Sequence, residues 1–159
     1  MLDWNVIKQK AQQYYEEGKR KIRQYTPESW SPEKKFVNAL VISMALMTMA
    51  DKKVETSEVT KAIELIKEIE EIQELNLVQE AIELYEKHLE DLEQALQKSE
   101  VKYILEVERK LADIAKIKEY PEYPGMVINL LAIIAKADND FAPEEKEMIE
   151  KIKETLKRS

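Results

Sequence analysis

The chain lacks cysteine and has very little glycine and histidine. Among its 159 residues there are no cysteines, two glycines and one histidine, His88. The absence of cysteine excludes disulfides, thiolate nucleophiles and zinc or iron–sulfur sites built on cysteine. A single histidine excludes a metal cluster built on several histidines. Two glycines are also fewer than a strand-rich fold needs for its turns.

A long hydrophobic run is missing as well. The longest apolar stretch, residues 36–50, contains Asn38, Ser43 and Thr48. It is shorter than the roughly 20 residues that a membrane-spanning helix needs. Residues 1–4 do not show the pattern of a signal peptide, which is a basic start followed by an apolar core. We therefore expect a cytoplasmic protein.

The abundant residue types favour a helical fold. Hydrophobic residues make up 44% of the chain and charged residues 36%, a balance typical of a mostly helical protein with a real apolar core. The length suits one domain, which we place at residues 32–159. Residues 1–31 are predicted to form an amphipathic N-terminal helix and a linker. The predicted fold class is all-α.

The net charge of −7 is unevenly distributed along the sequence. Residues 1–25 carry six basic and three acidic side chains, whereas residues 55–93 carry three basic and thirteen acidic ones. This asymmetry predicts a charge-polarised surface, although ordinary solvated helix faces are the alternative. The acidic balance argues against nucleic acid as a partner. The basic first segment suggests a peripheral contact with the inner face of a membrane.

Apolar periodicity predicts about seven helices. They cover approximately residues 3–24, 32–50, 59–69, 76–96, 99–117, 126–137 and 143–157. The predicted N-caps are Asp3, Ser31, Asn76 and Ser99. Pro32, which follows Ser31, suits the first position of a helix.

The histidine and the methionines receive structural interpretations. Met44, Met47 and Met49 occur at helical spacing among leucines, so we predict that they fill gaps in the core. His88 lies beside an apolar stripe and is predicted to be partly exposed, with no special role. A di-iron helical bundle needs a glutamate three residues before its histidine, and Tyr85 occupies that position.

One segment of the chain occurs twice, at an offset of 87 residues. Residues 41–59, VISMALMTMADKKVETSEV, match residues 128–146, INLLAIIAKADNDFAPEEK. Each copy consists of an apolar helix, Ala-Asp, a short loop and the start of an amphipathic helix. We interpret the copies as two similar helical hairpins packed with approximate two-fold symmetry, so that their acidic loops lie at one end of the molecule.

The duplicated element resembles the tellurite-resistance protein TerB and its TerB-like relatives. In their pattern, Ala or Ser and Asp follow an apolar helix; a glycine often comes next, and an apolar residue and then Glu complete the motif. The second copy, Asp138 to Glu145, follows this pattern with Asn139 at the glycine position. The first copy departs further, because Lys52 stands there. The likeness covers roughly residues 32–157.

This resemblance implies an all-helical protein associated with resistance to tellurite and other stresses, often alongside further Ter proteins. It implies no assigned reaction. It also implies a set of acidic residues that bind a divalent cation, and oxygen ligands of this kind suit calcium or magnesium. The matching positions are Asp51, Glu58, Asp138, Asp140 and Glu145.

Helix capping is another explanation for the glutamates. If Pro143 begins a helix, Glu145 is its third residue, where the helix dipole favours negative charge. The loop is also not an EF-hand, because Pro143 would occupy the position of its essential glycine. Asp51 and Asp138 instead follow helix C-termini, where an anion is disfavoured by about 0.3–1 kcal/mol. Loop N–H groups, a lysine or a cation can each offset this cost.

We therefore expect a TerB-like protein that acts by binding other proteins, with a calcium or magnesium ion as its candidate cofactor. The alternative is a purely structural helical adaptor without metal or catalytic activity. An enzyme is disfavoured, because the sequence shows no nucleophile–base pair, glycine-rich phosphate loop or histidine cluster.

Overall fold

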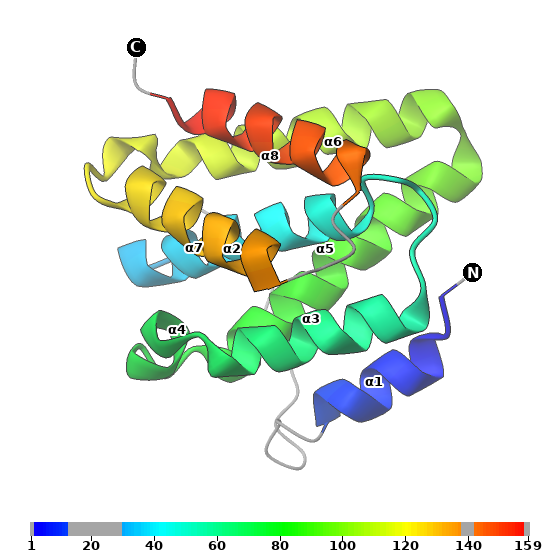
Figure 1. Ribbon diagram of the computed structural model, residues 1–159, viewed down its shortest axis with the longest axis horizontal. Helices are drawn as coiled ribbons and strands as arrows, with labels where there is room; N and C mark the ends of the chain where they lie inside the picture. The colour runs from blue at the N-terminus through cyan, green and yellow to red at the C-terminus, as the bar shows by residue number, and fades with distance from the viewer. Residues whose placement is uncertain (1, 13–29, 138–141, 158–159) are drawn as a thin grey trace.

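A computed structural model describes residues 2–12, 30–137 and 142–157. These residues form helices joined by short loops and include no strand, which confirms the all-α prediction (Figure 1). None of the described helices is long and apolar enough to cross a membrane. The elements are α1 (Trp4–Gln12), α2 (Pro32–Thr48), α3 (Thr56–Glu68), α4 (Glu70–Glu74), α5 (Val78–Lys98), α6 (Glu100–Ala115), the 3-10 helix η2 (Lys116–Glu119), α7 (Tyr123–Ala137) and α8 (Pro143–Leu156).

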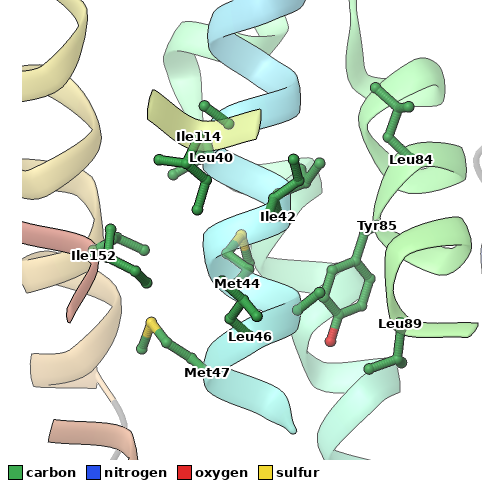
Figure 2. Close-up of a cluster of buried hydrophobic side chains, with 14 of the residues drawn as sticks. Leu40, Ile42, Met44, Leu46, Met47, Leu84, Tyr85, Leu89, Ile114 and Ile152 are labelled. Atoms are coloured by element: carbon green, nitrogen blue, oxygen red, sulfur yellow. The ribbon is translucent and has the colours of Figure 1, made fainter. Parts of the chain in front are cut away.

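Helix α2 is the centre of the core. All of its residues from Phe36 to Met47 are buried, because α5, α6, α7 and α8 pack against it. Figure 2 shows α2 between Tyr85 and Leu89 of α5 on one side and Ile152 of α8 on the other. The three methionines that the sequence assigned to the core are buried here, as predicted.

Three of the four predicted N-caps are confirmed. Asp3, Ser31 and Ser99 each accept a hydrogen bond from a backbone N–H in the first turn of the helix that follows. These bonds satisfy donors that have no partner inside the helix. The sequence therefore marks the starts of α1, α2 and α6 correctly.

The prediction for Asn76 is wrong, because this residue ends α4 instead of starting α5. Asn76 adopts a left-handed backbone conformation, with φ of 57°. The N–H of Leu77 bonds to the carbonyl of Ile72, and the N–H of Asn76 bonds to that of Gln73. This is the Schellman pattern of a helix C-terminus, in which asparagine tolerates the left-handed position that glycine usually fills.

Helix α1 packs against α3, and contacts from its side chains and from the residue before it hold it to the rest of the fold. Ile7 is completely buried. The N–H of Asp3 donates to Thr56 Oγ1 at 2.8 Å, and the indole Nε1 of Trp4 donates to Glu93 Oε1 at 3.0 Å. The described part of the first helix ends at Gln12, so its predicted extension falls on residues outside the described chain. The domain division after residue 31 stays a prediction.

The two predicted hairpins are present as α2–α3 and α7–α8. In Figure 1, α2 and α7 run toward the right of the molecule, and α3 and α8 run back. The approximate two-fold relation between the hairpins stays a prediction. Helix α7 is less enclosed than α2, although its sequence is the more apolar of the two. Ile133 is 63% exposed, because α7 lies at the outside of the bundle.

Two isoleucine substitutions test this difference in burial. Ile42→Ala, in the fully buried part of α2, is expected to lower the free energy of unfolding by about 2–5 kcal/mol through lost burial and a residual cavity. Ile133→Ala removes the same atoms from an exposed position and is expected to change it by less than about 0.5 kcal/mol. Urea denaturation of both variants measures the difference, and equal losses would contradict the assigned core.

Candidate functional site

The first hairpin loop, residues 49–55, closes on its own backbone. Asp51 Oδ1 accepts a hydrogen bond from the N–H of Lys53 at 2.9 Å. This bond offsets the unfavourable place of an anion after the C-terminus of α2. Tyr103 of α6 donates its hydroxyl proton to the carbonyl of Met49 at 3.0 Å. A loop N–H, one of the three predicted ways to stabilise Asp51, is therefore present.

Lys52 connects this loop to the start of α6. It has a φ of 61°, a left-handed conformation that favours glycine. This is the position at which the TerB-like pattern has its glycine. Its ammonium group forms an ion pair with Glu100 and lies 5.5 Å from the ring centroid of Tyr103. Burial raises the pKa of Tyr103 to about 12, and the negative charges of Glu100 and Asp51 add to this effect.

Both glutamates of the repeated motif occupy the third position of a helix. Glu58 is the third residue of α3 and Glu145 the third residue of α8. Glu145 Oε1 accepts a hydrogen bond from the N–H of Ala142, at a donor–acceptor distance of 3.4 Å. Negative charge at this position also interacts favourably with the helix dipole. Helix capping accounts for Glu145. Glu58 occupies the same position in α3, where the helix dipole also favours its negative charge.

Cation binding by Asp51 and Glu58 at the first loop stays a prediction. Calcium and magnesium need several oxygen ligands from the protein or from water, and the described residues contain no group of three acidic or histidine side chains that could hold a metal ion. Asp51 is hydrogen-bonded within its loop, and Lys52 places a positive charge at the same turn. Asp138 and Asp140, predicted as ligands in the second loop, lie outside the described residues.

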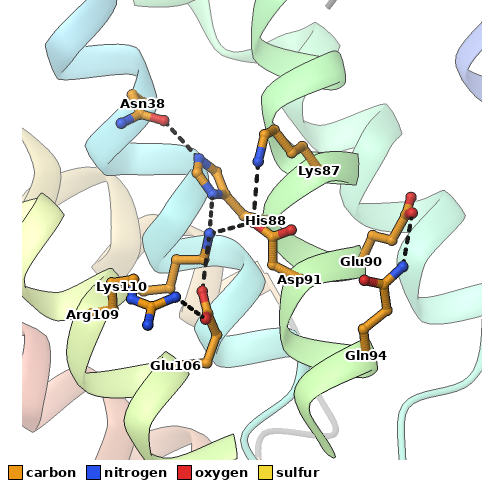
Figure 3. A network of polar contacts seen from close by, with 9 residues as sticks. All are labelled: Asn38, Lys87, His88, Glu90, Asp91, Gln94, Glu106, Arg109 and Lys110. Carbon is orange, nitrogen blue, oxygen red and sulfur yellow. Dashed lines mark hydrogen bonds and ion pairs between the residues drawn. The ribbon is translucent and has the colours of Figure 1, made fainter. Parts of the chain in front are cut away.

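A buried polar cluster, which the sequence did not predict, links α2, α5 and α6. We call it the His88 cluster; its members are Asn38, His88, Asp91, Glu106 and Lys110 (Figure 3). The prediction of a partly exposed His88 is wrong, because its side chain is 6% exposed. The ring is buried between α2 and α6, whose Asn38 and Lys110 contact its two nitrogens.

The hydrogen bonds of the cluster assign the protons of His88. Lys110 Nζ lies 2.8 Å from His88 Nδ1, and an ammonium group can only donate. Nδ1 is therefore the acceptor, and Nε2 carries the proton that it donates to Asn38 Oδ1 at 2.7 Å. The imidazole is neutral in this arrangement. Burial lowers the pKa of His88 well below its usual value, and the positive charges of Lys110 and Lys87 lower it further.

Lys110 carries the buried positive charge of the cluster. Its Nζ lies 2.7 Å from Asp91 Oδ2 and 3.5 Å from Glu106 Oε2. Each carboxylate also has a more exposed cation beside it: Lys87 pairs with Asp91, and Arg109 pairs with Glu106. The charge of Lys110 is thus shared by two carboxylates that extend from the interior toward the surface, which lowers the cost of its burial.

A signal for this cluster exists in the sequence. Lys110 falls between Val107 and Leu111 in the buried stripe of α6, and His88 falls between Tyr85 and Leu89 in the stripe of α5. Polar residues at core positions of two neighbouring helices indicate that they pair with each other. Reading the stripes of both helices together would have found the pair.

The comparisons with known proteins support one family. The model of the family described as tellurite resistance protein TerB matches residues 37–159, which is most of the chain. The chain belongs to the TerB family. The match begins within α2, continues to the end of the chain and includes the His88 cluster, and it leaves α1 outside. The search of curated proteins and the search of solved structures gave no match.

The His88 cluster predicts that this TerB-family protein loses stability in mild acid. Below pH 6.5 the unfolded chain binds a proton at His88, whereas the folded chain, with its lowered pKa, does not. The free energy of unfolding therefore decreases as the pH is lowered, by up to about 1.4 kcal/mol per pH unit. The decrease continues until the pH reaches the pKa of His88 in the folded protein. Urea denaturation between about pH 7.5 and 5 measures this slope.

His88→Gln is the control for that prediction, because glutamine can accept from Lys110 and donate to Asn38 without titrating. We expect it to cost about 1–3 kcal/mol near neutral pH, since the amide does not fill the space of the ring. It should also remove part of the acid slope. Identical slopes in the two proteins would contradict the assignment of His88 as a buried neutral group.

Proposed function

We propose that this chain is a stress-response protein, active in resistance to tellurite, that acts by binding other proteins. The observation that carries the proposal is the match to the family of tellurite resistance protein TerB over residues 37–159. The place of the polar residues within the fold gives further support.

The buried environment of the only histidine in the chain supports binding rather than catalysis. Both ring nitrogens of His88 are occupied, one by Asn38 and one by Lys110, and the ring is buried. A general base must reach the proton of a bound substrate, and His88 cannot do so from this position. The sequence also has no cysteine that would serve as a nucleophile. We therefore assign no catalytic residue.

The surface that we propose for partner binding is acidic. Glu68, Glu70 and Glu74 are exposed, and Glu71 is half-buried, at the end of α3 and in α4. We call these four residues the acidic end. Four carboxylates within seven residues create a negative local field, which attracts a protein with a basic surface and accelerates its association. Further Ter proteins are the partners that family membership suggests.

A cation at the second loop is part of the proposal, with Asp138 and Asp140 as its ligands. These residues lie outside the described chain, and the carboxylate of Glu145 already accepts the N–H of Ala142. The proposal therefore places the cation at the aspartates and assigns helix capping to Glu145. A purely structural helical adaptor without metal remains the second candidate, supported by the hydrogen-bonded Asp51 of the first loop.

A cytoplasmic location and a membrane contact through residues 1–25 also remain proposals. Most of the basic residues that suggest this contact lie between positions 19 and 23, outside the described residues. Within the described part, Lys10 forms an ion pair with Glu64 of α3, and Lys8 is exposed. Lys10 therefore has an intramolecular role that does not need a membrane.

Replacement of three glutamates of the acidic end tests the binding function. Cells that lack the native protein are given the variant Glu68→Gln, Glu70→Gln, Glu74→Gln, and their growth in tellurite and the proteins crosslinked to the chain are measured. We expect resistance and crosslinking to fall by about tenfold or more, because removing like charges weakens an electrostatically steered complex. The matched control replaces Glu147, Glu150 and Glu154, which are exposed on α8.

Two outcomes separate the candidates. Full resistance with the acidic-end variant, or equal loss with the α8 control, would contradict partner binding through the acidic end. Asp138→Asn in the same cells distinguishes a regulatory cation from a structural adaptor. The cation hypothesis predicts that the Asp138→Asn variant loses resistance and no longer binds calcium or magnesium in calorimetry. The adaptor hypothesis predicts that the same variant keeps its resistance and changes only in melting temperature.

A further inference from the structure

Helix α1 contacts the rest of the molecule through one face. Trp4, Ile7 and Lys10 follow one another at three-residue intervals, which places them on the same side of the helix. Ile7 is completely buried, Trp4 and Lys10 are half-buried, and the residues between these three are exposed. In Figure 1, α1 lies at the lower edge of the molecule, beside α3. The helix therefore has one bound face and one exposed face.

The three contacts of the bound face differ in their chemistry. The indole Nε1 of Trp4 donates a hydrogen bond to Glu93 Oε1 of α5 at 3.0 Å. Ile7 supplies a fully buried apolar contact. Lys10 forms an ion pair with Glu64 of α3, and this pair lowers the pKa of the Glu64 carboxyl. We call the surface marked by Glu64 and Glu93 the α1 site. An aromatic N–H donor, an aliphatic side chain and a cation at three-residue intervals are the pattern that it accepts.

The connection of α1 to the fold differs from those of the other helices. Residues 13–31 separate α1 from α2, whereas the longest separations between other neighbouring α-helices are residues 49–55 and 116–122. A connection of this length can span tens of ångströms, so α1 can leave its site while α2 keeps its place in the core. The TerB family match begins at residue 37. Helix α1 is therefore an addition to the segment that identifies the family.

Few buried groups hold α1 in place. Its polar contacts are accessible to water, since the side chain of Glu64 is 52% exposed, and ion pairs of this kind add little net stability. Leu2 and Ile7 are the buried apolar side chains of this segment. In α2, by comparison, every residue from Phe36 to Met47 is buried. Opening of α1 should therefore cost much less free energy than unfolding of the domain.

We propose that the α1 site is a docking site for an amphipathic helix, and that α1 occupies it as a detachable cap. In this arrangement α1 is an intramolecular ligand that opens and closes while the helices from α2 to α8 stay folded. The partner is a helix of another protein with the same pattern of aromatic donor, aliphatic residue and cation. Because α1 is tethered, its effective concentration at the site is high, and the partner must compete with it.

A single introduced thiol in the full chain tests whether α1 opens, because the chain has no cysteine of its own. Ile7→Cys places the thiol between α1 and its site, and Ile42→Cys places a matched thiol in the core, since both isoleucines are completely buried. The rate of reaction with a thiol reagent is measured for each variant. We expect Ile7→Cys to react at least about a hundredfold faster. Its rate should change little in dilute urea, because local opening exposes little surface.

A peptide with the sequence of residues 1–12 tests whether the vacated site takes a helix. Peptide bound at the site keeps α1 open and should therefore accelerate the reaction of Ile7→Cys. For a dissociation constant on the order of 0.1 mM, about 1 mM peptide gives roughly a tenfold acceleration. Two peptide variants are matched controls. Ile7→Glu removes the buried contact and should have no effect, whereas Val6→Glu, at a position that is 42% exposed, should act like the native peptide.

Several results would overturn the proposal. Equal reaction rates of Ile7→Cys and Ile42→Cys, or a global loss of helix in Ile7→Cys, would make α1 part of the cooperative core. A native peptide without effect, or an Ile7→Glu peptide that accelerates the reaction equally, would show that the site recognises no helix. Acceleration by phosphatidylserine vesicles and not by the peptide would also overturn it, because α1 would then leave its site for a membrane.

The proposal does not rest on the partner binding proposed above. The acidic end comprises Glu68, Glu70, Glu71 and Glu74, and these measurements alter none of them. A failure of the α1 site therefore leaves the acidic end untouched, and the reverse also holds.

Discussion

The arrangement of α2, α5 and α6 depends on the buried ammonium group of Lys110. Its Nζ contacts His88 of α5 at 2.8 Å and Asp91 of the same helix at 2.7 Å, and His88 in turn bonds to Asn38 of α2. Apolar contacts are not directional, so helices that share only such contacts can pack in several registers. A shift of one helix would leave a charge unpaired in the interior, at a cost of several kcal/mol. The cluster thus selects one register among those that the apolar core would allow.

The surface that we propose for partner binding lies outside this frame, at the end of α3 and in α4. In the first hairpin, the motif residues serve the turn: Asp51 accepts a backbone N–H, and Lys52 takes the left-handed position. In the second, Glu145 caps α8. The duplicated motif therefore carries a folding function in the described residues, and any ligand must use side chains that the turn leaves available. In this chain, the described residues of the TerB motif stabilise the turn between two helices.

Sequence reasoning succeeded where the cause is local. Helix starts at Asp3, Ser31 and Ser99 follow from side chains that bond within one turn. The helical spacing of the three methionines among leucines likewise placed them in the core. It failed at Asn76, whose side chain suits an N-cap as well as a left-handed C-terminal position, and the end of α4 decides between them. It also failed at His88, because burial of the ring depends on residues 50 positions earlier and 22 positions later. The exposure of α7 likewise depends on packing order and not on composition.

The protonation of His88 is the most direct test of this account. Nitrogen NMR of the imidazole, recorded between about pH 7.5 and 5, distinguishes the two neutral tautomers from the imidazolium. We predict one fixed neutral form, with the proton on Nε2, that persists in the folded protein well below pH 6.5, the usual pKa of histidine. An imidazolium at pH 6, or rapid exchange between the two tautomers, would contradict a buried cluster in which Lys110 donates to His88.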